Sequence, residues 1–311
     1  MPEDAVPSFD IVGIGMSILD SIKIVPSFPA EGGVTEVHRS ALMGGGPVPT
    51  ALCAASRLGA KTAILDRIGD DWRGDLIHED YTKFGVDVSF LKREAEARST
   101  FGTVLVRELD GERHIIFEEG DFTPFSSEEL PFEALGNSSI LHLNGRHWPA
   151  CIDAARMVKE NGGLVSFDGG AHRYDSKFHD LFPYVDILIV ARDFAECLSE
   201  SQERRPQLDS LSQWGADIVG ITNGVHGSDW LINRQETFHQ PAFPVEDVVD
   251  TTGCGDVFHG AFLFALSRGD DAKACARFAS ATAALSAKGL GGRGNLPSLP
   301  EVEGMLAETQ G

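Results

Sequence analysis

The stretch Asp250-Thr251-Thr252-Gly253-Cys254-Gly255-Asp256, with the apolar run 257–266 after it, predicts a helix whose first turn is left open for an anion. The first-turn N–H groups of a helix have no intrahelical partners, and the helix dipole adds partial positive charge there. Gly253 and Gly255 carry no Cβ, so the backbone can approach an anion closely. We therefore expect a phosphate-binding turn.

A carboxylate at this turn needs its own explanation, because it would repel a phosphate. Asp256 is best explained as a base that takes a proton from a hydroxyl group attacking the phosphate. The alternative from the residues alone is that Asp250 and Asp256 are a helix cap and a first-turn acid. Cys254 lies beside a dipole that lowers a thiol pKa, but we expect it to serve as a small residue of the anion hole.

The composition is that of an acidic globular protein. The chain has 311 residues, of which 42% are hydrophobic and 23% charged, and this length fits one large α/β domain or two ordinary ones. Its 47 acidic and 26 basic side chains give a formal net charge of −21. This charge argues against nucleic acid or an anionic membrane surface as a partner, because both need clustered Lys and Arg.

The cysteine content and the N-terminal sequence indicate the cellular compartment in which the protein is expected. Five dispersed cysteines form no CxxC pair, which suits a reducing compartment better than a disulfide framework or a zinc site. Residues 1–10 lack the apolar core of a signal peptide, and no apolar run reaches membrane-spanning length. We therefore expect a cytoplasmic protein with no membrane partner.

Short apolar runs alternate with helix-length segments, which predicts a mostly parallel sheet covered on both faces. The expected buried strands are 11–15, 62–66, 140–143, 164–167, 187–190 and 218–222. The expected helices are 47–58, 74–84, 272–288 and 299–308. Residues 228–233 and 235–240 predict an antiparallel hairpin at one edge of this sheet.

Two segments interrupt the alternation. Residues 21–41 alternate weakly and contain prolines, which is typical of exposed strands and turns. Residues 103–107 and 113–117 flank Asp110-Gly111, which supplies the positive φ angles of a tight hairpin turn. We expect these segments to form one small sheet beside the main domain.

The stretch 250–256 is similar to the C-terminal signature of the PfkB/ribokinase family of sugar kinases, although Cys254 stands where alanine is commoner. Further family segments follow in the same order over nearly the whole chain. They are 13–20, 44–46, 67–74, 222–227 and 289–294. Within the family, the segments 147–148, 166–169, 240–243 and 256–260 most resemble the sulfofructose kinase branch. Ketohexokinase is a more distant second, through 145–146 and 190–193.

The resemblance implies one ribokinase-like domain over residues 1–311, a three-layer α/β sandwich with a mostly parallel central sheet. It implies a small β-sheet lid from about residues 18–42 and 98–119. The implied reaction is transfer of the γ-phosphoryl group of ATP to a hydroxyl group of a small sugar, a hexose or ketose derivative, with Mg²⁺ as cofactor and K⁺ in some members. Because exposed strand edges often pair between protomers, we expect a homodimer through the lid strands.

The resemblance also implies roles for single residues. Asp256 would be the general base, and the amides of Gly253, Cys254 and Gly255 would form the anion hole. The implied substrate-binding residues are Asp20, Gly45, Gly46 and Thr50. The implied nucleotide-binding residues are Thr222, Gly224 and Gly227, with Gly289 and Gly292 of the 289–294 loop near the adenine. Asp193 and Glu196 would organise Mg²⁺ through water, and Asp250 and Thr252 stand where some members bind a monovalent cation.

Residues after two strands complete the candidate substrate site. Asn144 and Arg146 follow the strand 140–143, at the sheet edge where ligands bind in such folds. Arg146 fits an anionic group of the substrate or, equally, a structural carboxylate. Asp168 follows its own strand in the same way.

Because some positions depart from the family pattern, the resemblance does not identify the sugar substrate. Pro47 and Thr50 stand where many members carry an Asn that bonds sugar hydroxyls, and residues 191–194 replace the usual Asn-x-x-Glu magnesium motif. Val34 stands where the sulfofructose kinase branch carries Lys, which disfavours a sulfonated sugar. The alternatives are a nucleoside kinase of the same fold and a non-catalytic sugar- or nucleotide-binding protein. Retention of both Asp256 and the glycine pair argues against the latter.

Overall fold

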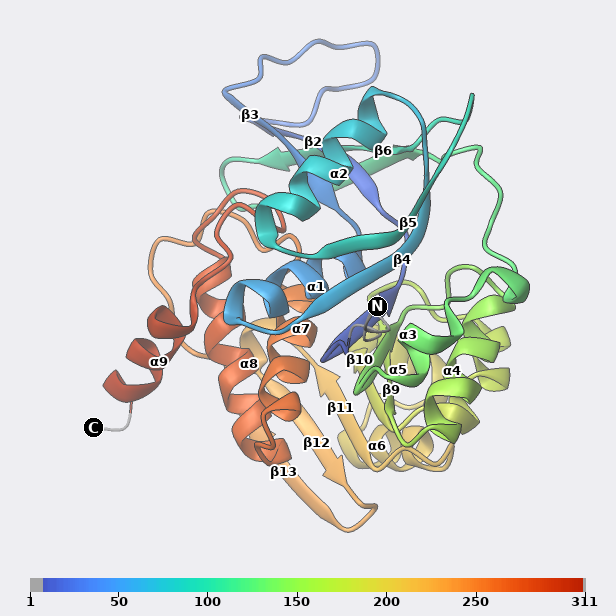
Figure 1. The fold of residues 1–311 in the computed structure, drawn as a ribbon. Helices are drawn as coiled ribbons and strands as arrows, with labels where there is room; N and C mark the ends of the chain where they lie inside the picture. The colour runs from blue at the N-terminus through green and yellow to red at the C-terminus, as the bar shows by residue number, and fades with distance from the viewer. Residues whose placement is uncertain (1–7, 310–311) are drawn as a thin grey trace.

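A nine-stranded sheet forms the centre of the molecule, in the order β13-β12-β11-β10-β9-β8-β1-β4-β5 (Figure 1). The computed structural model describes residues 8–309. The strands from β5 to β11 are parallel, whereas β12 and β13 add an antiparallel hairpin at one edge. The strands are β1 (Ile11–Ile14), β4 (Thr62–Gly69), β5 (Asp87–Glu94), β8 (Ile140–Leu143), β9 (Leu164–Gly169), β10 (Ile187–Ala191), β11 (Ile218–Thr222), β12 (Ser228–Ile232) and β13 (Glu236–Gln240).

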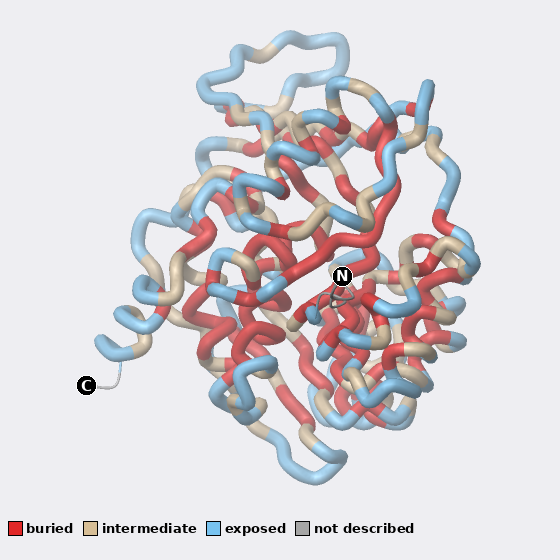
Figure 2. Tube along the Cα trace, in the orientation of Figure 1, coloured by how far each residue is buried: buried red, intermediate tan, exposed pale blue. Residues whose placement is uncertain are grey.

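Helices cover both faces of this sheet and produce two hydrophobic cores. One core lies under α3 (Phe132–Gly136), α4 (Ala150–Glu160), α5 (Arg192–Ser199) and α6 (Arg204–Ser212). The other lies under α1 (Pro47–Leu58), α2 (Trp72–Phe84), α7 (Cys254–Ser267), α8 (Ala272–Ser286) and α9 (Leu299–Glu308). Figure 2 shows the buried chain concentrated between these layers. Short 3₁₀ turns occupy Ser127–Glu129, Ser176–Asp180, Phe182–Tyr184 and Gly224–His226.

A second sheet of four strands lies beside the first, in the order β3-β2-β6-β7. Its strands are β2 (Ile18–Val25), β3 (Arg39–Gly45), β6 (Thr100–Arg107) and β7 (Arg113–Glu118). The β6–β7 hairpin turns at Asp110-Gly111, where Gly111 has a φ of 70° but Asp110 does not have a positive φ, so the expected conformation is present at Gly111 alone. The interrupting segments therefore form one small sheet, as the sequence predicts.

The sequence misses one strand. Residues 87–94 were not expected to form a strand, yet β5 pairs with β4 at the edge of the large sheet. The reason is exposure: β5 is half-exposed and carries charged side chains, so it lacks the continuous apolar run of the buried strands. Among the helices within residues 8–309, none combines the length and apolar character needed to cross a bilayer.

The parallel strands place their carboxyl ends at one edge of the large sheet, where ligands bind in open α/β sheets. The chain passes from the end of β1 directly into β2 of the small sheet. Asp168, near the end of β9, contacts His259 of α7. The strand ends, the start of the small sheet and the N-terminal half of α7 therefore meet in one region.

Candidate active site

Asp250 holds the turn that precedes α7. Its Oδ1 accepts hydrogen bonds from the backbone N–H (2.8 Å) and the hydroxyl (2.7 Å) of Thr252. Its Oδ2 accepts from the N–H of Gly291 (2.9 Å). Gly253 has a φ of 75°, and a Cβ there would lie 2.5 Å from the Cα of Gly292. Glycine is therefore required at 253 by conformation and by space.

The first turn of α7 is open. Within the described residues no side chain caps the N-terminus of this helix. The Cys254 N–H donates to the Thr251 carbonyl oxygen at 3.3 Å, and the N–H groups that follow in the first turn keep their capacity to donate. A Cβ on Gly255 would meet no atom of residues 8–309 within 4 Å. The backbone at Gly253, Cys254 and Gly255 thus has the accessible, donor-rich geometry of an anion site.

Asp256 lies in this first turn and is half-buried. Burial, and then the charge of Asp168, raise the pKa of Asp256 to about 7. Three cations oppose this shift in part, namely Arg173, Arg293 and Arg113. A carboxyl group with this pKa exchanges protons near neutral pH, as a general base must.

Cys254 differs from the sequence expectation in one respect. The helix dipole alone would lower its thiol pKa, but burial raises it, and the charges of Asp250 and Asp256 act in the same direction. The Ser286 hydroxyl lies 3.5 Å from Sγ and donates to it. The thiol therefore stays protonated, which agrees with a structural rather than a reactive cysteine.

Asp20 on β2 sits between two glycines of the neighbouring strands. A Cβ on Gly45 or on Gly102 would overlap its carboxylate. Burial raises the pKa of Asp20 to about 6, although Arg293 lowers it in part. Gly46, with a φ of 93°, precedes Pro47 at the first position of α1. The Asp20 carboxylate, Gly45 and Gly46 thus lie together where β2, β3 and α1 meet.

Arg293 is a residue of this region that the sequence reasoning missed. Its side chain is 1% exposed. It donates to the Gly45 carbonyl oxygen (2.9 Å), to Thr50 Oγ1 (3.2 Å) and to Asp80 Oδ2 (2.5 Å). The hydroxyl of Thr50, a predicted sugar ligand, therefore has a protein partner. The only sequence signal was an arginine inside the 289–294 glycine-rich loop.

Asn144 and Arg146 follow β8, as expected. Asn144 Oδ1 is buried and has no hydrogen-bond partner among the described residues. Arg146 contacts Met16 Sδ and lies 3.4 Å from Glu119 Oε1. Arg146 thus has a carboxylate neighbour in the structure, and its contact with substrate stays a prediction.

The candidate nucleotide residues form a turn at the end of β11. The Thr222 hydroxyl donates to the Val190 carbonyl oxygen at 3.4 Å. Asn223 N–H donates to the Gly227 carbonyl oxygen at 2.8 Å, and Gly224 and Gly227 have φ values of 52° and 81°. A Cβ on Gly224 would meet no atom within 4 Å, so this turn is open.

The 289–294 loop lies on the other side of the α7 turn. Gly291 donates to Asp250, Gly292 faces Gly253, and a Cβ on Gly291 would collide with Ile22 of the small sheet. Gly289 packs against Asn295, the residue just past the same loop. The structure thus joins this loop to the anion turn and to the small sheet, and its contact with adenine stays a prediction.

The candidate magnesium residues lie on the first two turns of α5. Asp193 accepts from the His172 N–H at 2.5 Å, and Glu196 accepts from Arg192 Nε at 2.8 Å. Their side chains are 34% and 31% exposed. Within residues 8–309 no three His, Cys, Asp or Glu side chains converge on a metal position. Mg²⁺ commonly takes one or two carboxylates together with phosphate and water, so these two oxygen donors fit it chemically.

Comparisons with known proteins agree with this geometry. Residues 8–299 match the family described as pfkB family carbohydrate kinase. Aminoimidazole riboside kinase of Salmonella typhimurium is 32% identical over 277 residues, 83% of this chain and 84% of that protein. Ketohexokinase of Mus musculus is 25% identical over 276 residues, 86% of this chain and 92% of that protein.

Solved structures share the fold. The ribokinase of Arabidopsis thaliana complexed with ribose and ATP superposes with a TM-score of 0.83 at 24% identity, over 96% of this chain and 99% of that one. The expected ribokinase-like α/β fold, with its large mostly parallel sheet and smaller sheet, is confirmed. The protein is a phosphotransferase of the sugar and nucleoside kinase type, and the chain belongs to the pfkB family of carbohydrate kinases.

Proposed function

We propose that this kinase transfers the γ-phosphoryl group of ATP to a hydroxyl group of a small sugar, a hexose or ketose derivative, with Asp256 as general base. One observation carries the proposal. A half-buried carboxyl group with a pKa of about 7 stands in the first turn of α7, beside backbone N–H groups that no side chain caps within the described residues.

Each part of the region has a defined task in this reaction. Asp20, Gly45 and Gly46 bind the sugar, with Asn144 and Arg146 at the adjacent strand end. As the sugar oxygen attacks, Asp256 accepts its proton, because a sugar hydroxyl is too weak an acid to ionise at neutral pH. The N–H groups of residues 253–255 stabilise the negative charge of the transferring group. Thr222, Gly224 and Gly227, with Gly289 and Gly292, hold the nucleotide.

The proposed reaction uses Mg²⁺ but does not need K⁺. Asp193 and Glu196 would hold Mg²⁺ through water, and the ion supplies charge neutralisation for the phosphates. Asp250 and Thr252, the candidate K⁺ residues, already satisfy one another, since the Asp250 carboxylate accepts from Thr252 and Gly291. This hydrogen bonding explains both residues without a cation, and no step here uses K⁺.

The small sheet is suited to act as the lid. Arg113 of β7 reaches the anion turn, where its Nη1 lies 3.3 Å from Thr251 Oγ1. Ile22 of β2 lies close to Gly291 of the C-terminal loop. A lid held at these points would keep water away from the transferring phosphoryl group and limit ATP hydrolysis.

The function is tested by measuring ADP formation with a panel of hexoses, ketoses, pentoses and nucleosides, against a reaction without acceptor. We expect one sugar to raise turnover well above the background. A nucleoside kinase is the second candidate, because the relative from Salmonella typhimurium is named for a riboside, and a strong preference for nucleosides would replace our proposal with it. Sugar binding in a thermal-shift assay without any turnover would indicate the non-catalytic alternative.

The exposed strand β7 supports the expected homodimer. All of its residues are exposed, including Ile115 (54%), Ile116 (68%) and Phe117 (62%), and it forms an edge of the small sheet. An exposed apolar edge strand is a template for pairing with a second copy. We expect the wild type to have twice the chain mass in light scattering and Ile116→Lys to be monomeric.

The control for that experiment is Phe132→Lys on α3, which changes a side chain of similar exposure (55%) outside the small sheet. This variant is expected to keep the dimer. A monomeric wild type, or a dimer that survives Ile116→Lys, would remove β7 as the interface.

A further inference from the structure

A buried polar cluster lies on the sheet face beneath α7, and the proposed reaction does not use it. His142 of β8, Ser166 and Asp168 of β9, and His259 of α7 are each at most 4% exposed. His142 Nδ1 lies 3.2 Å from Ser166 Oγ, and His259 Nε2 lies 3.4 Å from Asp168 Oδ1. The two imidazole rings are 5.4 Å apart. Burying four polar side chains is costly unless they are paired or serve a purpose.

The position of His259 connects this cluster to the proposed base. Asp256 and His259 are three residues apart on α7, so they lie on the same face of the helix. His259 contacts Asp168 directly, and Asp168 Oδ2 has no hydrogen-bond partner among the described residues. The buried carboxylate of Asp168 therefore contacts α7 one helical turn after Asp256.

The Asp168 carboxylate is ionised at neutral pH, whereas the imidazoles beside it are not. Burial lowers the pKa of His142 to about 3 and also lowers the pKa of His259, so both imidazoles are neutral at pH 7. Burial opposes ionisation of Asp168, but His259, Arg173 and His142 lower its pKa overall; the two imidazoles act in this way only in acid, where they are charged, so at pH 7 Arg173 is the cation that faces Asp168. Arg173 Nη1 lies 3.9 Å from Asp168 Oδ2 and is 40% exposed, so solvent screens part of its charge.

We infer that Asp168 is a positioning residue for Asp256: its buried negative charge keeps the Asp256 carboxyl a strong proton acceptor, and its contact with His259 fixes the start of α7 against the sheet. The inference rests on the proposed role of Asp256 as base. It also gives a purpose to the two imidazoles, because neutral His259 and His142 surround Asp168 without cancelling its charge at pH 7.

The charged groups around Asp256 predict effects of opposite sign. Asp168 on β9 raises the pKa of Asp256, whereas Arg173 after β9, Arg293 in the C-terminal loop and Arg113 on β7 lower it. Removing the Asp168 charge must therefore shift the titration of Asp256 to lower pH. Removing the Arg173 charge must shift it to higher pH.

The test follows the titration of Asp256 itself by carboxyl-¹³C NMR in the free protein, with the resonance assigned by its loss in Asp256→Asn. Asp168→Asn keeps the shape of the side chain and is expected to move the midpoint down by about 1 pH unit. Arg173→Met, on a partly exposed loop, is expected to move it up. Asp186→Asn, the same charge change beside β10 where the carboxylate bonds Val165 N–H, is the matched control and leaves the midpoint in place.

The pH dependence of kcat gives a second reading. In Asp168→Asn the acidic limb moves down by the same amount, kcat on the plateau falls several-fold because Asp256 is a weaker base, and KM for the sugar is unchanged. An Asp256 midpoint that stays in place in both Asp168→Asn and Arg173→Met overturns the inference. The titration does not need turnover, so failure of the proposed reaction shows separately, as an absence of activity in the wild type.

Discussion

Replacing Asp256 with asparagine is expected to lower kcat by about 10²- to 10⁴-fold, the usual contribution of a general base. The amide has nearly the shape of the carboxylate but cannot accept the proton of the attacking hydroxyl. The N–H groups of the anion turn stay in place, so residual turnover above background is expected. KM for the sugar changes little, because Asp256 acts mainly in the transition state.

The wild-type pH profile follows from the same carboxyl group. Burial and Asp168 raise the pKa of Asp256 to about 7, and only the ionised form can accept a proton. Activity therefore rises with pH through about 7 and reaches a plateau above it, while acidic solution protonates the base. In Asp256→Asn we expect the residual activity to lack this rise with pH.

Asp270→Asn is the control for that variant, because it changes a half-buried acid just beyond the other end of α7. Its kcat and pH profile are expected to match the wild type, measured as ADP formation at saturating sugar. If Asp256→Asn kept more than about a tenth of wild-type kcat, Asp256 would not be the base.

Local signals in the sequence predict much of this fold. The helix α1 begins and ends where expected, at Pro47 and Leu58, because Pro47 suits the first helical position and Gly59 supplies a left-handed C-cap. Gly111 marks the β6–β7 turn in the same way. The strand β5 was not predicted, because its alternation of apolar and polar residues at 86–90 is short and it lacks the continuous apolar run by which the buried strands were identified.

In the candidate site, too, features set by residues close in sequence could be predicted, and features set by distant residues could not. The heptapeptide 250–256 is enough to predict the open turn at 253–255 and the position of Asp256 in the first helical turn, because both depend mainly on residues close in sequence. Partners distant in sequence cannot be seen that way: Arg293 donates to Gly45 at a separation of 248 residues. This contact gives Thr50 a protein partner. Likewise, burial of the Cys254 thiol depends on the tertiary fold, and it outweighs the dipole effect that the sequence suggested.

Replacing Arg293 with methionine is expected to cost about 3–5 kcal/mol of unfolding free energy, as loss of one member of a buried ion pair does. The guanidinium is 1% exposed and holds together three parts of the chain: the C-terminal loop, Gly45 at the end of β3, and Asp80 on α2. Methionine fills similar volume but leaves the Gly45 oxygen and the Asp80 carboxylate without their donor. The midpoint of thermal unfolding is expected to fall on the order of 10 °C.

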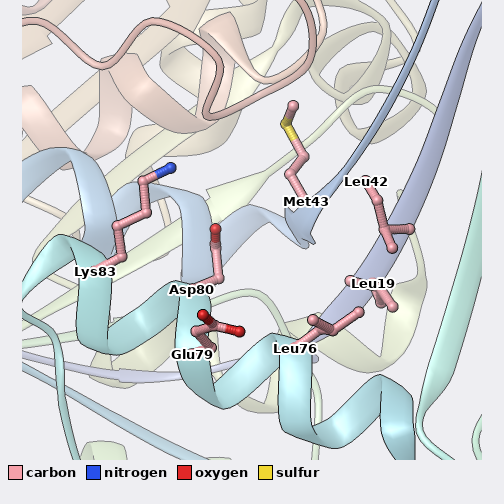
Figure 3. A pocket seen from close by; sticks show the side chains of 7 residues that line it. All are labelled: Leu19, Leu42, Met43, Leu76, Glu79, Asp80 and Lys83. Atoms are coloured by element: carbon pink, nitrogen blue, oxygen red, sulfur yellow. The ribbon is translucent and has the colours of Figure 1, made fainter.

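The surroundings of Asp80 set the size of this effect. Its side chain is 12% exposed and lines a cavity of about 300 Å³ between α2 and the small sheet (Figure 3). Leu19, Leu42 and Met43 line it from β2 and β3, and Lys83 lies on the same helix as Asp80. Water entering this cavity can solvate part of the Asp80 charge, so the cost belongs at the lower end of the range.

A double variant and a control variant test the origin of the stability loss in Arg293→Met. Arg293→Met with Asp80→Asn removes both charges and is expected to recover part of the loss, because the unpaired buried carboxylate is the costly species. Arg205→Met breaks an exposed pair with Asp209 and is expected to leave the midpoint of thermal unfolding unchanged. Arg293 also lowers the pKa of Asp20, so Arg293→Met must weaken sugar binding at a pH near 6 by leaving more of Asp20 protonated. An Arg293→Met protein as stable as Arg205→Met would show that the buried contacts of Arg293 with Gly45 and Asp80 contribute little to stability.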